Sequence, residues 1–153
     1  MARIDKHVIQ ITAEVKAQPN NQKIGKAFEQ EWMDHLASRG MWVHFMQPAP
    51  DGSQPFDVMA IDDHYGITTV YAYDCKTLSG NRFPLSRVED NQRLAFESLN
   101  RKGVDKTFFV IKNKTAIYCI PSQEVIFRKD SGEKSILLGD YHAYMYLEQD
   151  DNQ

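Results

Sequence analysis

The most regular hydrophobic pattern in the chain repeats every fourth residue, at Ile24, Phe28, Trp32 and Leu36. Residues with this spacing share one face of an α-helix, so the pattern predicts a helix buried along that stripe. Asn20 and Asn21 offer an N-cap and Gly40 a C-terminal cap, which sets the expected helix from about residue 20 to residue 39. The preceding residues, 3–17, suit either a short helix or an arm.

Strand-like segments dominate the next part of the chain, with Val, Thr and aromatic residues bounded by turn residues. We expect strands at 41–47, 56–61 and 67–76. Ser86-Arg87-Val88-Glu89 matches a capping box and predicts that a second long helix starts there and ends near Gly103. Its inward positions are expected to be Val88, Leu94 or Ala95, and Leu99.

The last third of the chain predicts a hairpin over 104–112 and 115–120, then a short helix opening at Pro121-Ser122. Strand-like alternation of aromatic residues follows in 136–147. Helices mixed with strands in this order predict an α/β domain with a central mixed sheet flanked by helices. We expect a single domain over residues 20–147, preceded by an N-terminal arm or short helix at 1–19 and followed by an acidic tail at 148–153.

The length of 153 residues suits one domain with a substantial core, and 42% hydrophobic and 25% charged residues are typical of a soluble globular protein. No apolar stretch is long enough for a membrane helix, and the N-terminus lacks the apolar segment of a secretion signal. Cys75 and Cys119 both lie in apolar, strand-like sequence. They are expected to be buried, reduced thiols in a cytoplasmic protein.

Charge is unevenly distributed although the net charge is only −3. Residues 45–75 contain five Asp and no Lys or Arg, whereas residues 76–114 contain nine Lys or Arg and four Asp or Glu. An acidic pocket beside a basic surface suits a metal-dependent nuclease, since acids hold cations and bases hold phosphates. Ordinary scatter of surface charge is the alternative interpretation.

The candidate chemistry centres on Asp74-Cys75-Lys76 and on Asp57, seventeen residues upstream. Alternate residues of a strand share a face, so Asp74 and Lys76 are expected on one side and Cys75 on the other, towards the core. If the two strands form a hairpin, Asp57 approaches Asp74, and Mg²⁺ or Mn²⁺ prefers such carboxylate ligands. In the alternative interpretation Asp57 caps a turn and Lys76 ends a strand in solvent.

Two residues on the predicted helices extend this candidate site. Glu29 lies one position from the buried stripe and is either a metal-reaching acid or a solvated helix residue. Gln92, early in the second helix, is able to bind a metal-bound water or a phosphate. The residues considered for phosphate contacts are Lys26, Arg82, Arg87 and Arg93, together with Lys23, Arg101 and Lys102. No glycine-rich phosphate loop is present, so no nucleotide cofactor is expected.

Taken together, Asp57, Asp74-Cys75-Lys76-Thr77, Arg82-Phe83-Pro84-Leu85 and Asn91-Gln92 resemble the PD-(D/E)xK nuclease superfamily. Within it, the chain is most similar to RecU-type Holliday junction resolvases and their phage relatives. Gly25-Lys26-Ala27-Phe28-Glu29 also looks like the opening helix motif of that family. The chain departs from the pattern in having Asp at position 74, where Glu is usual, and Asn at position 91, where His is usual.

The resemblance implies a restriction-endonuclease-like fold and an active site formed by Glu29, Asp57, Asp74, Lys76 and Gln92. It further implies one or two Mg²⁺ ions on Asp57, Asp74 and the Cys75 backbone carbonyl, with Glu29 assisting. The implied activity is cleavage of branched DNA by a homodimer in a bacterial or phage-infected cell.

Two other functions remain open on sequence grounds. One is a restriction-like or general structure-specific nuclease acting on duplex, flap or nicked DNA. The other is a catalytically silent nuclease fold that only binds DNA or a protein partner.

Overall fold

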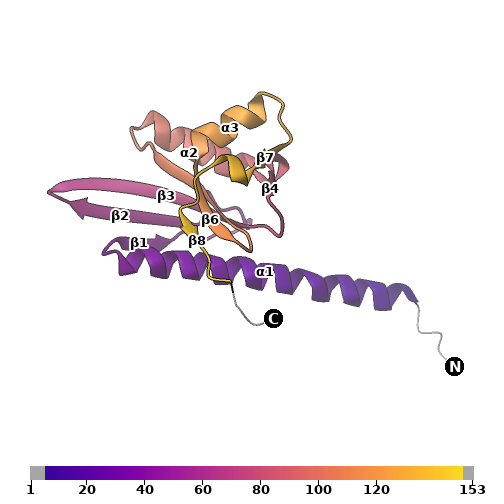
Figure 1. The fold of residues 1–153 in the computed structure, drawn as a ribbon. Coiled ribbons are helices and arrows are strands. Elements are labelled where there is room, and N and C mark those ends of the chain that lie inside the picture. The colour runs from indigo at the N-terminus through magenta and orange to yellow at the C-terminus, as the bar shows by residue number, and fades with distance from the viewer. Residues whose placement is uncertain (1–5, 150–153) are drawn as a thin grey trace.

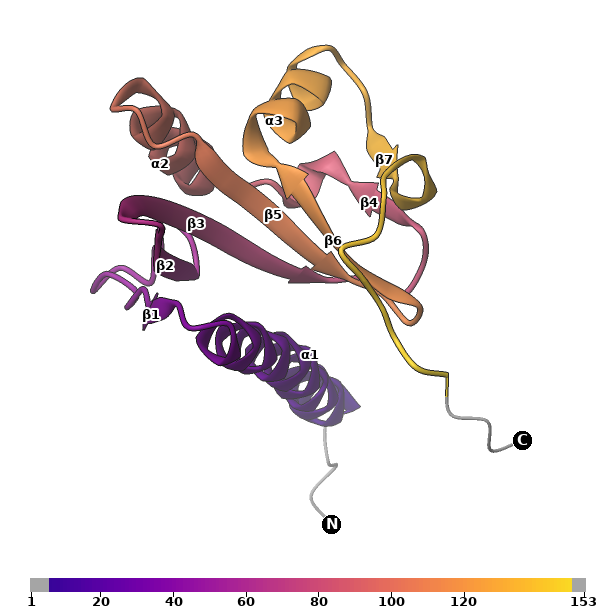
Figure 2. The ribbon, with the colours of Figure 1, turned by 60° about the vertical axis from the view of Figure 1, so that its left-hand side comes forward.

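The computed structural model describes the backbone of residues 6–149 and the side chains of residues 21–149. A six-stranded sheet lies between one helix on one face and two helices on the other (Figures 1 and 2). The helices are α1 (Lys6–Ser38), α2 (Asp90–Arg101) and α3 (Ser122–Asp130). The strands of this sheet are β1 (Trp42–Phe45), β2 (Val58–His64), β3 (Ile67–Thr77), β5 (Lys106–Lys112), β6 (Ala116–Pro121) and β8 (Met145–Tyr146). The predicted α/β class, a mixed sheet flanked by helices, is confirmed.

The sheet has the order β1-β2-β3-β5-β6-β8 and is antiparallel except at its centre. There β3 and β5 run parallel, with Asp74 opposite Phe109. Parallel neighbours need a crossover connection, and α2 supplies it. Two short strands, β4 (Arg82–Pro84) and β7 (Ser135–Leu137), pair separately from the main sheet. The crossover brings the first turn of α2 to the end of β3, where the candidate chemistry lies.

Each face of the sheet has its own hydrophobic cluster. On one face, Phe28, Trp32 and Leu36 of α1 pack against strand residues that include Val58 and Val110. On the other, the α2 residue Phe96 is fully buried against Phe109. The predicted stripe on the first helix is therefore confirmed at three positions. The fourth, Ile24, is 56% exposed, because it lies beyond the part of α1 that the sheet covers.

The helix starts predicted from capping signals are wrong. α1 begins at Lys6 and passes through Asn20 and Asn21, so these residues do not start it. Residues Leu85–Arg87 form a short 3-10 turn, and α2 begins four residues later than predicted, at Asp90. The capping box is formed by Glu89 and Gln92.

The inward face of α2 agrees only in part with the predicted one. Leu94 is 64% exposed, whereas Ala95 and Leu99 pack against the core as expected. Phe96, a fully buried core residue, was missed because the expected face was set partly from Val88, which lies before α2 begins. The end of α1 and the hairpin of β5 and β6 are confirmed.

The C-terminal part is less regular than predicted. Residues 136–147 form only β7 and β8, with a 3-10 turn at Leu138–Asp140 between them. Within residues 6–149 no helix combines the length and apolar character needed to cross a membrane. The division into arm, nuclease domain and acidic tail stays a prediction, and residues 1–5 and 150–153 lie outside the described part of the chain.

Candidate active site

Asp57 directly precedes β2 and lies beside the edge of β3. Its backbone N–H donates to the Tyr73 carbonyl over 3.0 Å, as a further residue of β2 would. Two residues further along β3, the backbone N–H of Cys75 donates to the Asp57 carboxylate Oδ2 over 2.8 Å. An extended residue directs its N–H and C=O to the same edge, so the Cys75 carbonyl also lies on the Asp57 side.

Asp74 and Lys76 project together from β3, as the alternation of a strand requires. Lys76 Nζ lies 3.1 Å from Asp74 Oδ2, and both side chains are nearly enclosed, with exposed fractions of 11% and 2%. Cys75 points to the opposite face and packs against the cluster under α1. The predicted geometry of this tripeptide is confirmed, and Lys76 does not end in open solvent.

The first turn of α2 holds Asp74 in place through Gln92. The Gln92 Oε1 accepts the backbone N–H of Glu89 over 3.2 Å, and this bond fixes which end of the amide faces the sheet. Gln92 Nε2 then donates to Asp74 Oδ1 over 3.1 Å. The capping box therefore has a second role, because it aims a buried amide at a buried carboxylate.

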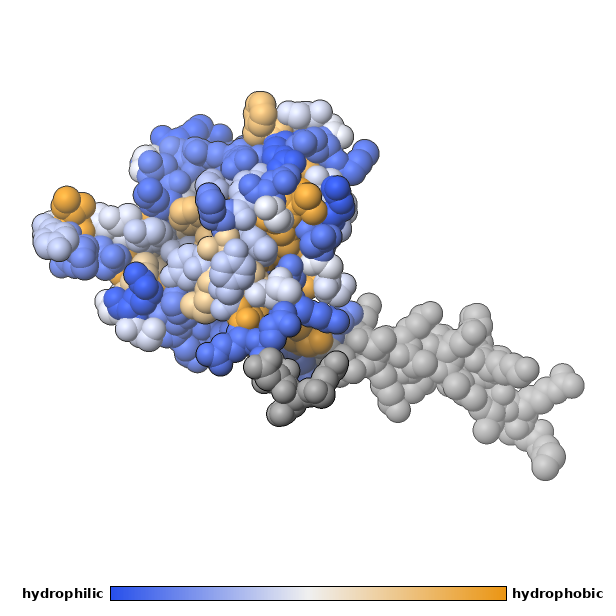
Figure 3. All heavy atoms as spheres, viewed as in Figure 1, coloured by the Kyte–Doolittle hydropathy of each residue, from blue (hydrophilic) through white to orange (hydrophobic). Residues whose placement is uncertain are grey.

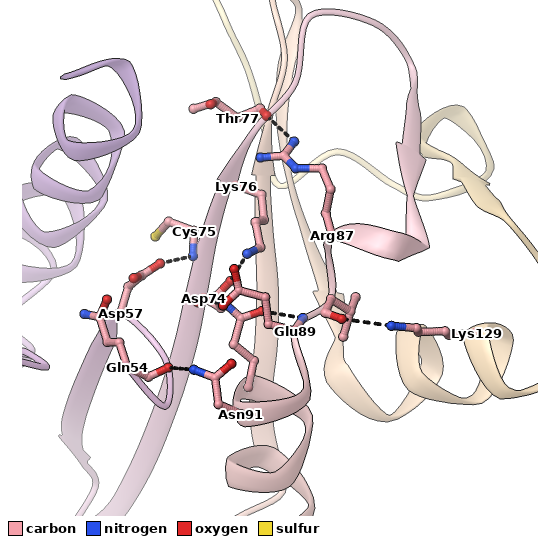
Figure 4. A network of polar contacts seen from close by, with 12 residues as sticks. Gln54, Asp57, Asp74, Cys75, Lys76, Thr77, Arg87, Glu89, Asn91 and Lys129 are labelled. Carbon is pink, nitrogen blue, oxygen red and sulfur yellow. Dashed lines mark hydrogen bonds and ion pairs between the residues drawn. The ribbon is translucent and has the colours of Figure 1, made fainter. Parts of the chain in front are cut away.

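Glu29 reaches the same place from α1. It lines a cavity of about 550 Å³, the site cavity, whose wall also includes Asp57, Asp74, Lys76 and Gln92. Figure 4 shows Asp57 on one side of β3 and Asp74 with Lys76 on the other. All five residues implied as an active site by the resemblance thus come together around the end of one strand. Their catalytic roles stay a prediction.

Burial dominates the electrostatics of the three carboxyl groups. It raises the pKa of Asp74 well above its usual value, and the neighbouring Asp57 raises it further. Burial also raises the pKa of Asp57, against the lowering effect of the Cys75 N–H. Burial and then Asp57 raise the pKa of Glu29 to about 7. With all three ionised, Lys76 would balance only one of three charges, and such a site attracts a cation or a proton.

A divalent metal suits these residues in part. Asp74 Oδ2 is buried and accepts no well-formed hydrogen bond from the described part of the chain, its approach to Lys76 being ionic. Among residues 21–149, however, no three His, Cys, Asp or Glu side chains already form a metal-binding group. A divalent ion bound here would be held by Asp57, Asp74 and the Cys75 carbonyl, and Mg²⁺ accepts such a site because it needs few protein ligands.

The four basic residues predicted to bind DNA lie in different surroundings. Arg87 lines the site cavity and donates to the Thr77 carbonyl over 2.6 Å. Lys26 is exposed on α1, close enough to Glu29 to lower its pKa. Arg82 is exposed on β4 and does not line the site cavity. Arg93 also lies outside that lining. Its guanidinium is paired with Asp130 through two 2.6 Å contacts and with Glu97.

Two features of the site were missed by the sequence analysis. Glu89 lines the site cavity and caps α2. Asn91 donates its amide to the Gln54 carbonyl and so ties α2 to the loop that leads into Asp57. Glu89 and Gln92 have the spacing of a capping box, so the sequence does contain a signal for this cap. Ser86 and Glu89 have the same spacing, and the cap was predicted there instead. The Asn91 contact joins residues far apart in the chain and has no local signal.

Gln92→Leu is expected to lower the free energy of unfolding by about 1–3 kcal/mol, because it removes the bonds to Glu89 and Asp74 while keeping the side-chain volume. Urea unfolding measures this change. The matched control is Gln30→Leu, since Gln30 is an exposed amide on α1 that bonds Asp34. Equal, small effects of the two substitutions would contradict the role given to Gln92.

Glu29 is expected to make stability fall with rising pH when no metal is present. Its pKa in the folded state, about 7, exceeds its ordinary value of 4.5, so the folded state holds the proton more tightly. The stabilisation is complete below pH 4.5 and is lost by about pH 7. Because Glu29 is only half-buried, we expect about 1–2 kcal/mol. Urea unfolding in EDTA across this range should show a shallower fall for Glu29→Gln, and parallel curves would rule the effect out.

Comparison with known proteins yields little at the level of sequence. No protein-family model matches the chain, and no curated protein matches it. Among solved structures, it is similar to Hjc of Archaeoglobus fulgidus, a Holliday junction resolvase from an archaeal hyperthermophile, at 17% identity and a TM-score of 0.46. The match covers 63% of this chain and 75% of that one.

Proposed function

We propose that the protein is a metal-dependent endonuclease that hydrolyses phosphodiester bonds in DNA. The observation that carries this proposal is the enclosure of Asp57, Asp74 and Glu29 with Lys76 in one cavity at the end of β3. A nuclease that uses a hard cation needs oxygen ligands, a nearby fixed positive charge and space for a phosphate. The site cavity has all three: carboxylate oxygens from the acids, the ammonium of Lys76, and open space beside them.

Bound Mg²⁺ would supply Lewis-acid polarisation of the phosphate and a water of lowered pKa. Asp57 is held ready by the Cys75 N–H, and Asp74 by the Gln92 amide, so neither carboxylate has to reorganise. Lys76 lies beside these carboxylates with its ammonium nearly enclosed. There it orients the attacking water and stabilises the negative charge that develops on the phosphate oxygens. Burial strengthens both effects because little water competes.

The substrate we propose is branched DNA, of which the four-way junction is one form. Its support is the resemblance in sequence around Asp74-Cys75-Lys76 and Asn91-Gln92. Arg87, in the wall of the site cavity, and Lys26, on the nearby surface of α1, are suited to phosphate contacts. A homodimer acting on both strands in the cytoplasm belongs to the same proposal.

The proposal is tested by incubating the protein with four-way, flap and linear duplex DNA in Mg²⁺, Mn²⁺ or EDTA. The double variant Asp57→Asn with Asp74→Asn, purified identically, controls for a contaminating nuclease. We expect metal-dependent cleavage by the wild type only, with paired nicks across the four-way junction. Equal cleavage of all three substrates would favour a general nuclease. Retained DNA binding without cleavage would favour a silent binding module and overturn the proposal.

A further inference from the structure

A second cavity adjoins the site cavity. It has a volume of about 910 Å³ and lies between α1, the residues that follow β3, and the turn between β5 and β6. Asn21, Thr77 and Arg87 line both cavities. The second cavity therefore continues the site cavity along the chain direction of β3, away from Asp74. A strand of nucleic acid that places a phosphate in the site cavity would carry its neighbouring nucleotide into this space.

The wall of the second cavity is apolar. Ile24, Leu78 and Leu147 line it, and Ile24 is 56% exposed although it continues the buried stripe of α1. In the view of Figure 3, hydrophobic surface is visible where α1 meets the body of the protein. A large aliphatic side chain left in water on an otherwise polar helix surface costs solvation free energy that a flat, apolar ligand would recover.

Basic residues also line the second cavity. Arg87, Lys112 and Lys114 contribute three positive charges, and Glu31 contributes one negative charge. Glu31 Oε2 forms an ion pair with Lys112 Nζ over 2.6 Å. The charges of Arg87 and Lys114 therefore remain to bind a ligand. A cavity lined by both apolar and basic side chains is complementary to a nucleotide, whose base is flat and weakly hydrated and whose phosphate is anionic.

We propose that the second cavity binds the nucleotide next to the cleaved phosphate, with its base unstacked from the helix. In this arrangement the base lies against Ile24, Leu78 and Leu147, and the phosphate contacts Arg87 and Lys114. The proposal rests on the proposed nuclease function and adds to it a binding site for one unpaired nucleotide. Unpaired nucleotides at branch points and flaps would enter the second cavity with little loss of stacking free energy, because their bases are already free to leave the stack.

The test separates base contact from phosphate contact. Binding of a short fluorescent oligodeoxythymidylate is compared with binding of an oligomer of the same length made of abasic units, in EDTA so that no cleavage occurs. We expect Ile24→Ser to weaken binding of the base-containing oligomer about tenfold and to leave the abasic oligomer unaffected. Lys114→Ala should weaken the binding of both oligomers equally. The control, Leu94→Ser, changes a similarly exposed aliphatic residue on α2, outside both cavities, and should change neither.

Several outcomes would overturn the inference. They are an unchanged affinity of Ile24→Ser, an equal loss for Leu94→Ser, or tight binding of free thymidine monophosphate, which would indicate a free-nucleotide site. A change of sedimentation in Ile24→Ser without a change in DNA affinity would assign the apolar wall to a contact between copies. Because binding is measured without metal, failure here leaves the cleavage test intact. Conversely, failure to cleave leaves base-dependent binding as an independent result.

Discussion

Asp74→Asn is expected to reduce metal-dependent DNA cleavage at least about a thousandfold while leaving the protein folded and more stable. Asparagine keeps the shape of the side chain and still accepts the Gln92 bond. Its amide nitrogen replaces Oδ2 beside Lys76, whose ammonium keeps Asp57 and Glu29 as acidic neighbours. The substitution removes the negative charge that a cation needs. Asp74 is 1% exposed, and burial of its carboxyl group opposes ionisation, so the wild type carries this charge at a cost in stability.

The gain in stability should depend on pH. A folded-state pKa raised above the unfolded value contributes stability that is present at low pH and lost as pH rises. We therefore expect Asp74→Asn to exceed the wild type by about 1–2 kcal/mol at pH 8 and by little at pH 3, below the ordinary pKa of 3.8. Chemical unfolding in EDTA measures the difference. Asp63→Asn, at an exposed position near the end of β2, is the matched control and should leave cleavage and stability unchanged.

Lys76→Met should have the opposite effect on stability and a similar effect on cleavage. Methionine fills much of the same space but leaves Asp57, Asp74 and Glu29 without their shared cation, and Lys76 Nζ now lies 3.1 Å from Asp74. The loss is limited because Asp74 takes up a proton when the cation is gone. We expect about 1–3 kcal/mol of destabilisation, larger at high pH, and a loss of cleavage of about a hundredfold or more.

The control for this prediction is Lys106→Met, because Lys106 is exposed at the start of β5 on the same sheet. It should change neither stability nor cleavage. Cleavage by Lys76→Met at the wild-type rate would remove Lys76 from the proposed mechanism. A stability gain in Lys76→Met would show that the three carboxyl groups are already neutral at the pH of the assay.

Taken as a pair, Asp74→Asn and Lys76→Met separate function from stability. A residue retained for folding should lower stability when it is replaced by an isosteric neutral group. Asp74→Asn is expected to raise stability instead. If Asp74→Asn and Lys76→Met change stability in opposite directions and both abolish cleavage, the cluster is a site maintained for its chemistry.

Some of the fold follows from local pattern alone. The four-residue repeat at Phe28, Trp32 and Leu36 predicted a helix with one buried face, and the run of Thr, Val and Tyr predicted β3. These signals are strong because a helix or strand repeats its geometry over many residues. Helix starts were predicted poorly, since a single Ser or Asn forms a cap only where the tertiary structure lets the chain turn.

The sequence by itself determined that Asp74 and Lys76 share a face of one strand, because alternation is a property of the extended backbone. Only the tertiary structure decided that Asp57 would bond the Cys75 N–H, that Glu29 would arrive from the opposite layer, and that Gln92 would face Asp74. These relations depend on where β2 begins beside β3, on how α1 crosses the sheet, and on the crossover that places α2. Contacts between distant segments follow from packing of the whole chain, which no local spacing encodes.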